Sequence, residues 1–236
     1  LRLANSLHRE TGLSNLCLSG GVALNCVGNG RVLREGPFQR LWIQPAAGDA
    51  GSALGAALNV HYHFLNQPRT SPGPGDAMRG SYLGPRFSNE DIERSLQKLD
   101  APYERVEDPA LFHQVAEYLA EGKVIGWMQG HMEFGPRALG GRSILGDPRS
   151  EKMQSVMNLK IKYRESFRPF APSVLRERVS EYFEMDTDSP YMLLVAPIVE
   201  KRRLAIRSDQ QQLWGIDLLN VPKSDIPAVT HVDYSA

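Results

Sequence analysis

The chain is poor in cysteine, has no long apolar run and carries no net charge. Two cysteines occur among 236 residues, and no stretch approaches the roughly 18 consecutive apolar residues that a membrane-spanning helix requires. We therefore expect reduced thiols, a cytoplasmic location and no membrane partner. Basic and acidic residues balance at 27 each, which argues against a protein that coats nucleic acid through an extended basic face.

The remaining composition is typical of a globular protein with one large or two modest domains, because 42% of the residues are hydrophobic and 23% are charged. The chain begins at Leu1 without methionine or a signal-peptide pattern, and it stops at Ala236 without an evident helix end. We therefore expect the sequence to be part of a longer protein.

The first 64 residues use one pattern twice, in which a short apolar strand leads through a turn rich in small residues into a helix. The expected elements are a helix over residues 3–10, a strand over 16–18, a helix over 22–33, a strand over 41–43 and a helix over 52–64. Two such units in succession predict part of an α/β sheet.

A linker is expected next, because residues 66–80 contain three prolines and three glycines without hydrophobic periodicity. We place a domain boundary near residue 75, with a first domain over 1–75 and a second over 76–236. The second domain is also expected to be mixed α/β. Its expected elements are helices over 88–99, 108–121, 150–160 and 176–185, strands over 123–128 and 191–199, and a surface loop over 201–221. Ser88 and Asp91 are spaced as a capping box for the first of these helices.

A basic segment lies between Gly130 and Pro172, where eight lysines and arginines face only four acidic residues, a local charge of +4. Arg137 and Arg142 flank the irregular sequence at 138–141, which contains two glycines. Backbone of this kind can expose both cationic side chains and N–H groups to a bound anion.

Further along the basic segment, Lys160, Arg164 and Arg168 recur every four residues, as on one face of a helix. The residues Phe167, Pro169 and Phe170 argue against an exposed helix face at Arg168. Arginine binds phosphate oxygens bidentately and can stabilise charge that develops on phosphorus. We expect these cations to converge on one cavity that binds a small, multiply charged phosphate compound. The alternative is a solvated face of ordinary surface cations.

Two further candidates lie in the first domain. Gly20 and Gly21 follow a strand and precede a helix, so that either a nucleotide or anion contacts the backbone there or the pair is only a tight turn. The turn lacks the lysine of a P-loop and the spacing of a dinucleotide fingerprint. Asp49 precedes a helix rich in small residues, and it either caps that helix or serves as a metal ligand or charge partner. His61 and His63 point to different sides of the helix, so we expect no metal site there.

Five segments carry a resemblance to a known family. They are LCLSGGVALNCV (16–27), WIQPAAGDAGSALGAAL (42–58), GWMQGHMEFGPRALGGRSIL (126–145), LKIKYRESFRPFAPSV (159–174) and PAVTHVD (227–233). In this order they resemble the O-carbamoyltransferases, which include nodulation-factor carbamoyltransferases and enzymes that carbamoylate cephalosporin and aminoglycoside antibiotics.

The resemblance implies an α/β fold in two parts, namely the C-terminal portion of an actin-like ATPase-fold domain, similar to the tRNA threonylcarbamoyl-transfer protein, and a YrdC-like α/β domain. It also implies two reactions. Carbamoyl phosphate and ATP, with Mg²⁺, give carbamoyl adenylate and pyrophosphate in the YrdC-like domain. The carbamoyl group then passes to a hydroxyl of a small-molecule or oligosaccharide acceptor, such as a nodulation factor, in the actin-like domain.

The resemblance further implies roles for particular residues. The expected catalytic side chains, which bind carbamoyl phosphate and ATP, are Arg137, Arg142, Lys160, Arg164 and Arg168. Ser143 and Lys162 are expected to bind nucleotide, and so is the turn formed by Gly20, Gly21 and Asn25. Asp49 matches the C-terminal ligand of an Fe²⁺ site whose histidines would lie upstream of Leu1, so Asp49 alone is not expected to hold iron.

The chain departs from the family pattern at three positions. His131 stands where arginine is usual, Gly141 where asparagine is usual and Tyr234 where glycine is usual. Loss of a guanidinium at 131 is expected to weaken adenylate formation. The alternative function is a nucleotide-binding or RNA-binding YrdC-like module without transferase turnover. We expect no nucleic-acid partner, because few aromatic residues are interleaved with the cations.

Overall fold

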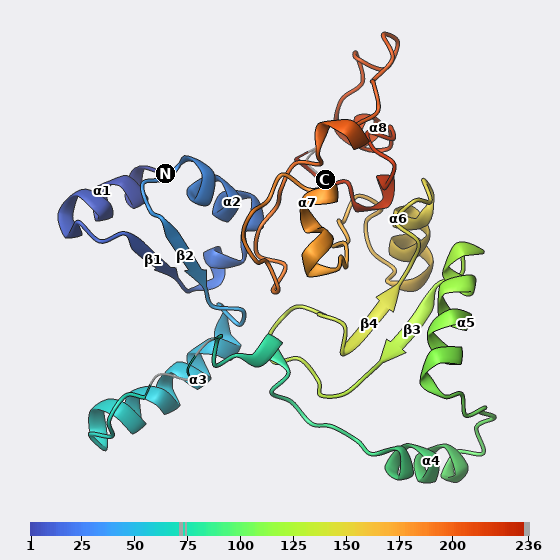
Figure 1. Ribbon diagram of the computed structural model, residues 1–236, viewed down its shortest axis with the longest axis horizontal. Helices are drawn as coiled ribbons and strands as arrows, with labels where there is room; N and C mark the ends of the chain where they lie inside the picture. The colour runs from blue at the N-terminus through green and yellow to red at the C-terminus, as the bar shows by residue number, and fades with distance from the viewer. Residues whose placement is uncertain (71–72, 74, 234–236) are drawn as a thin grey trace. The chain divides into compact units, whose positions relative to one another are not determined.

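The computed structural model describes residues 1–70, 73 and 75–233 (Figure 1). Contacts group the chain into two compact units, each assembled from three separated segments. Unit 1 consists of Leu1–Arg86, Gln129–Arg142 and Ser189–Val195, and unit 2 consists of Phe87–Met128, Ser143–Asp188 and Ala196–Ala236. Both units combine helices with short strands, which confirms the α/β prediction at that level. The boundary near residue 75 stays a prediction.

The helices and strands are mostly short. The helices are α1 (Arg2–Thr11), α2 (Cys26–Glu35), α3 (Asp49–Asn59), α4 (Asn89–Lys98), α5 (Asp108–Ala120), α6 (Met153–Val156), α7 (Val179–Tyr182) and α8 (Gly215–Leu219). The strands are β1 (Asn15–Leu18), β2 (Arg40–Ile43), β3 (Ile125–Met128) and β4 (Arg142–Leu145). Single π-helical turns at Val60–Phe64 and Met157–Ile161 extend α3 and α6. Across the described ranges, no helix has both the length and the apolar character needed to cross a bilayer.

Unit 1 is organised around the parallel strands β1 and β2, which pair from Asn15 opposite Arg40 to Leu18 opposite Ile43 (Figure 1). Parallel neighbours need a crossover connection, and α2 lies in the segment that joins these two strands. The buried apolar cluster of this unit consists of Ala23, Ile43, Ala47, Met78, Tyr191 and Leu193. The two predicted strand–turn–helix repeats are therefore confirmed.

The predicted helix over 22–33 is interrupted near its start. A 3₁₀ turn covers Gly21–Leu24, and α2 begins one residue after Asn25, whose backbone is extended. The Asn25 side chain accepts a hydrogen bond from the Gly28 N–H at 2.9 Å, so it is the N-cap of α2. The 3₁₀ turn and the extended residue Asn25 therefore separate Gly20 from the start of α2.

The start of α3 lies close to the loop that precedes it. The Gly51 N–H donates to the Gly48 carbonyl at 3.1 Å. A Cβ atom placed on Gly51 would lie 2.0 Å from the carbonyl oxygen of Ala46, which is far inside contact distance. Only glycine fits at this position with the backbone as it stands.

Tyr191 ties the third segment of unit 1 to the first. Its side chain is 5% exposed, and its hydroxyl donates to the carboxylate of Asp76 at 2.7 to 2.8 Å and accepts from the Gly80 N–H at 3.2 Å. Burial, with the hydrogen bond to Asp76, raises the pKa of Tyr191 to about 12. The neutral phenol is therefore the form that the folded state prefers.

Unit 1 is expected to lose stability at alkaline pH through Tyr191. Since the folded pKa lies above the unfolded value near 10, the contribution is complete below pH 10 and declines as the pH rises toward 12. The loss should amount to about 2 kcal/mol. Urea unfolding between pH 9 and 12 measures it, with Tyr191→Phe as the control that lacks this titration. Equal pH dependence in both proteins would contradict the assignment.

Unit 2 contains the strand pair β3–β4 and two buried clusters. The clusters consist of Phe183, Ala196, Ile198, Ile226 and Val229, and of Met153, Met157 and Ala228. The rings of Phe112 on α5 and Trp127 on β3 lie 6.5 Å apart, so α5 packs on this strand (Figure 1).

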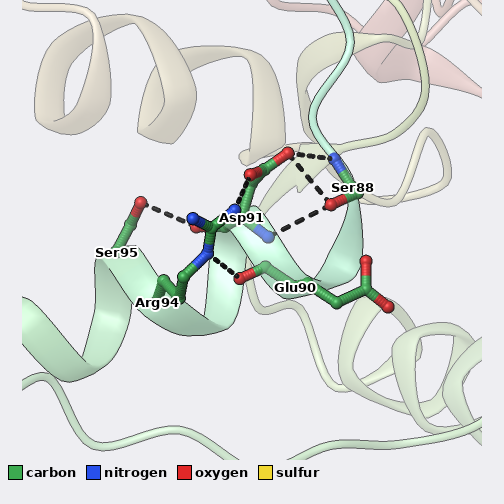
Figure 2. Close-up of polar contacts among 5 residues, drawn as sticks. All are labelled: Ser88, Glu90, Asp91, Arg94 and Ser95. Atoms are coloured by element: carbon green, nitrogen blue, oxygen red, sulfur yellow. Dashed lines mark hydrogen bonds and ion pairs between the residues drawn. The ribbon is translucent and has the colours of Figure 1, made fainter.

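The capping box predicted for α4 is confirmed, as Figure 2 shows. The Ser88 hydroxyl accepts from the Asp91 N–H at 3.2 Å, and the Asp91 carboxylate accepts from the Ser88 N–H at 3.2 Å. These contacts satisfy two backbone donors at the helix start. The Ser88 hydroxyl also donates to the Asp91 carboxylate at 2.9 Å, and this bond, with the one from the Ser88 N–H, holds the pKa of Asp91 below its usual value.

Several other element predictions for the second domain need correction. Residues 191–199 were expected to form a strand, but among the described residues they take part only in the bridge between Phe183 and Ile198, although most are buried. Pro197 has no N–H to donate to a ladder, and Met192 has a φ of 55°. The side chains of β3 are partly exposed instead of buried. The helix over 176–185 reduces to a 3₁₀ turn followed by α7, and the loop over 201–221 contains α8.

Candidate functional site

Three of the sequence motifs meet in unit 1. The Gly20 N–H donates to the Ala47 carbonyl at 2.8 Å, which joins the glycine turn to the loop before α3. A Cβ on Gly135 would lie 3.3 Å from the Cβ of Ala46, so the Gly-Pro-Arg loop packs against the same residues. The Arg137 Nη2 donates to the Leu24 carbonyl at 3.3 Å. The sequence did not predict this arrangement.

Arg137 has an unused donor in this setting. Its Nε is buried and has no hydrogen-bond partner among the described residues, and no carboxylate there forms a salt bridge with it. A buried, unsatisfied guanidinium N–H is costly and rare in native structures.

Arg142 is also held by neutral groups. Its guanidinium donates to the backbone carbonyls of Gln129, Gly130 and Gly141 at 2.6 to 3.3 Å. These contacts leave its positive charge without a carboxylate partner in the described part of the chain. Carbonyl oxygens fix the side chain but do not neutralise it.

The loop between these two arginines is closed by Glu133. One oxygen of its carboxylate accepts from the N–H groups of Leu139 and Gly141 at 2.7 Å and of Arg142 at 3.2 Å. The expectation that this loop offers its N–H groups to a bound anion is therefore wrong for these three donors. A side-chain anion already occupies them.

The glycine turn is open. Gly20 has a φ of 94°, and a Cβ atom on either Gly20 or Gly21 would meet nothing within 4 Å. Gly20 is therefore required by its backbone conformation. The side chain of Asn25, the third residue predicted for this turn, acts as the helix cap described above.

Asp49 is exposed and is the first residue of α3, whereas Gly48 occupies the cap position. Its side chain makes no capping hydrogen bond, so the interpretation of Asp49 as the N-cap is wrong. Within the described ranges no three His, Cys, Asp or Glu residues are grouped as metal ligands. The described residues do not complete an iron site around Asp49.

Unit 2 positions Arg164 through a buried amide. Asn158 is completely buried, and its Nδ2 donates to the carbonyls of Ser166 at 2.9 Å and Arg168 at 2.8 Å. Its Oδ1 accepts from the Arg164 Nε at 2.6 Å. The Arg164 guanidinium also lies 5.0 Å from the ring centre of Phe170, as in a cation–π contact.

The electrostatic setting of Arg164 is unusual for an arginine. Burial, followed by repulsion from Arg168, lowers its pKa below the usual value, although the group stays protonated. The stacked, amide-bonded side chain forms no salt bridge in the part of the chain that is described. Its Nη groups are therefore oriented without being neutralised.

The other predicted cations of unit 2 are more ordinary. Arg168 is exposed and pairs with Glu165 at 3.0 Å. Lys160 lies in the last part of the π-helical turn Met157–Ile161, and Lys162 follows that turn. Both side chains are exposed. Ser143 lies in β4 and is partly exposed.

The residues predicted to bind phosphate groups divide between the units. Arg137 and Arg142 belong to unit 1, and Ser143, Lys160, Lys162, Arg164 and Arg168 belong to unit 2. The expectation that all of them converge on one cavity stays a prediction.

Two of the three departures from the family pattern are in contact. A Cβ on Gly141 would lie 2.6 Å from the His131 carbonyl, and the His131 ring bonds the Gly84 carbonyl at 2.8 Å. A larger residue at 141 therefore requires movement of the backbone at 131. Tyr234 lies outside the described residues.

Glu133 and Asn158 organise the two groups of cations, and neither was predicted from the sequence. The signal for Glu133 is an acidic residue placed directly before a glycine-rich basic loop. For Asn158 it is an amide between Met157 and Leu159 in an apolar helix face. Polar side chains in such places are buried only when their hydrogen bonds are satisfied.

Comparison with known proteins gives matches over most of the chain. The family models described as carbamoyltransferase N-terminus and carbamoyltransferase C-terminus match residues 1–58 and 116–236. An uncharacterized protein of Synechocystis sp. is 63% identical over 100% of this chain and 38% of its own length. Nodulation protein NolNO of Sinorhizobium fredii is 44% identical over 97% of this chain and 31% of its own. Nodulation protein NolO of Bradyrhizobium diazoefficiens is 44% identical over 83% of this chain and 36% of its own length. The chain thus spans about a third of the length of these relatives.

Proposed function

Because this chain belongs to the carbamoyltransferase family, we propose that it forms part of an ATP-dependent O-carbamoyltransferase. In this proposal carbamoyl phosphate and ATP yield carbamoyl adenylate, and the carbamoyl group then passes to a hydroxyl acceptor. The acceptor is a small molecule or an oligosaccharide. The two relatives named as nodulation proteins make a nodulation factor one candidate.

The finer fold assignment belongs to the same proposal. The parallel strands of unit 1 with their glycine turn are compatible with the end of an actin-like ATPase-fold domain. The basic segment that follows is assigned to a YrdC-like domain. These assignments rest on the resemblance of the motifs, which the mixed α/β character of both units supports only in general terms.

The observation that carries the proposal is the state of three arginines. Arg137, Arg142 and Arg164 are held by carbonyl or amide oxygens, and none of them forms a salt bridge within the described residues. Arg149 in the same segment instead binds the Asp147 carboxylate bidentately. Oriented guanidinium groups whose charge is not neutralised are suited to phosphate oxygens.

The chemistry requires such charges. Carbamoyl phosphate and ATP together carry many phosphate oxygens, whose mutual repulsion must be offset before they react. For each adenylate formed, ATP releases pyrophosphate, and carbamoyl phosphate releases its phosphate with consumption of one water. We assign Arg137 and Arg142 in unit 1, and Arg164, Arg168, Lys160, Lys162 and Ser143 in unit 2, to binding these groups. Mg²⁺ enters with the phosphates of ATP.

Arg164→Ala tests the proposal in unit 2. Loss of charge-assisted hydrogen bonds to phosphate should weaken binding of carbamoyl phosphate by about tenfold. Calorimetry measures the affinity in the intact protein, and pyrophosphate release in the presence of ATP and Mg²⁺ measures turnover. The matched control is Arg207→Ala, which removes an exposed arginine that pairs with Asp209. Unchanged affinity in the Arg164 variant, or no pyrophosphate from the wild-type protein, would contradict the proposal.

The alternative of an RNA-binding module is not favoured by the family match. It predicts RNA affinity that falls steeply with added salt. A filter-binding titration with transfer RNA at two salt concentrations separates the two functions, because the transferase requires no such affinity.

A further inference from the structure

Glu133 has no role in the proposed reaction, although it lies beside two of the assigned arginines in the sequence. It belongs to unit 1 and immediately precedes the loop that carries Arg137 and Arg142. A single carboxylate oxygen receives the three backbone N–H groups described above, two of them at 2.7 Å. Converging N–H groups of this kind form a concave anion site, and here the anion is part of the chain itself.

The carboxylate is charged in this setting. Partial burial acts to raise the pKa of Glu133, but the N–H groups of Leu139, Gly141 and Arg142 outweigh it and hold the pKa below the usual value. A negative charge is therefore kept against the backbone of the loop that carries two arginines, which the proposed function assigns to anionic substrates. By charge alone, such a group weakens the binding of a phosphate compound.

The geometry explains why a carboxylate is nonetheless retained there. One of its three donors is the backbone N–H of Arg142, so Glu133 fixes the point from which that side chain departs. Gly140, within the closed loop, has a φ of 104° that holds the backbone in a turn. On the other side, the Tyr82 hydroxyl donates to the Leu139 carbonyl at 2.5 Å. The loop is thus held from both sides.

We infer that Glu133 is a positioning residue, which sets the loop conformation that presents Arg137 and Arg142 to phosphate groups of the substrates. The inference rests on the proposed function. In the absence of the carboxylate, the donors of Leu139, Gly141 and Arg142 lose their shared acceptor. The loop then samples other conformations, and the two guanidinium groups lose their orientation.

The sign of the effect on affinity tests the inference. Pyrophosphate binding to the intact protein is measured by calorimetry for Glu133→Gln and Glu133→Ala. Glu151→Gln is the matched control, since it removes the same charge from an exposed residue of the basic segment. Charge removal alone would tighten binding in all three variants. Positioning predicts weakening by about threefold in Glu133→Gln, whose amide oxygen still accepts hydrogen bonds, and by about tenfold in Glu133→Ala, with no weakening in the control.

Pyrophosphate affinity that is unchanged or tighter in both Glu133 variants would overturn the inference. Thermal unfolding of each variant identifies any that does not fold, and Glu133→Gln, which keeps the shape of the side chain, carries the test if Glu133→Ala does not fold. A second readout is turnover. The KM for carbamoyl phosphate should rise in Glu133→Gln more than kcat falls, whereas a merely destabilised protein would lose kcat in proportion to the unfolded fraction.

Arg142→Ala separates this inference from the proposed function. If Arg142→Ala weakens pyrophosphate binding and the Glu133 variants do not, the role of Glu133 is wrong while the assignment of Arg142 stands. If neither Arg142→Ala nor the Glu133 variants change the affinity, the assignment of this loop to phosphate binding is itself wrong.

Discussion

Replacement of Gly51 by alanine is expected to destabilise unit 1 by about 3 kcal/mol, the upper end of what overpacking costs. The added Cβ would lie 2.0 Å from the carbonyl oxygen of Ala46. That oxygen belongs to the backbone and cannot rotate away, so the first turn of α3 or the preceding loop must move. Because Ala46 and Ala47 also contact the Gly135 loop and Gly20, the shift should spread to the turn that carries Arg137.

Gly55→Ala is the matched control on the same helix. A Cβ atom on Gly55 would meet nothing within 4 Å. Alanine favours the helical state over glycine by up to about 1 kcal/mol, so this variant should be as stable as the wild-type protein or more stable. Urea unfolding of both variants measures the contrast. Similar midpoints for the two would refute the close contact at Gly51.

Asn158→Ala is expected to lower the stability of unit 2 by a comparable amount, about 3 kcal/mol. Its side chain is completely buried and makes three hydrogen bonds at 2.6 to 2.9 Å. Alanine would leave the Ser166 carbonyl and the Arg164 Nε without these partners and would open a cavity. The Arg168 carbonyl keeps a weaker bond from Gln154 at 3.3 Å.

The folded Asn158→Ala protein should also bind carbamoyl phosphate more weakly than the wild-type protein, because Arg164 loses the amide that orients it. The affinity is measured without urea or at urea concentrations at which the variant is still folded. Asn220→Ala is the control, since Asn220 is an exposed asparagine of the same unit, and its removal should change the unfolding free energy by less than about 0.5 kcal/mol. Equal unfolding midpoints for the two variants would show that the buried network contributes no net stability.

Much of the local structure follows from the sequence. The apolar runs at 16–18 and 41–43 are confirmed as strands, and the spacing of Ser88 and Asp91 correctly predicts a capping box. Residues 191–199 show the limit of such patterns. Their alternating burial is real, but whether a neighbouring strand exists depends on distant chain, and Pro197 removes a donor that a ladder needs.

Less of the candidate site could be predicted from the sequence. Composition and spacing draw attention to Arg137, Arg142 and Arg164, and the motif resemblance assigns them a chemistry. Neither reveals that Arg137 contacts a carbonyl 113 positions earlier, at Leu24, because that proximity arises only when the chain folds. Glu133 could not be predicted in this role, because the sequence shows it only as one of four acidic residues in a basic segment. Its hydrogen bonds to the loop backbone appear only in the folded chain.

Tyr191 and Leu193 complete the buried cluster of the first unit, although most of that unit is encoded more than a hundred positions earlier. During synthesis on the ribosome, the parallel strands and the glycine turn emerge long before these two side chains are made. The nascent unit therefore waits with part of its apolar surface uncovered until translation has passed Val195. Apolar surface that is uncovered over this interval favours association between chains.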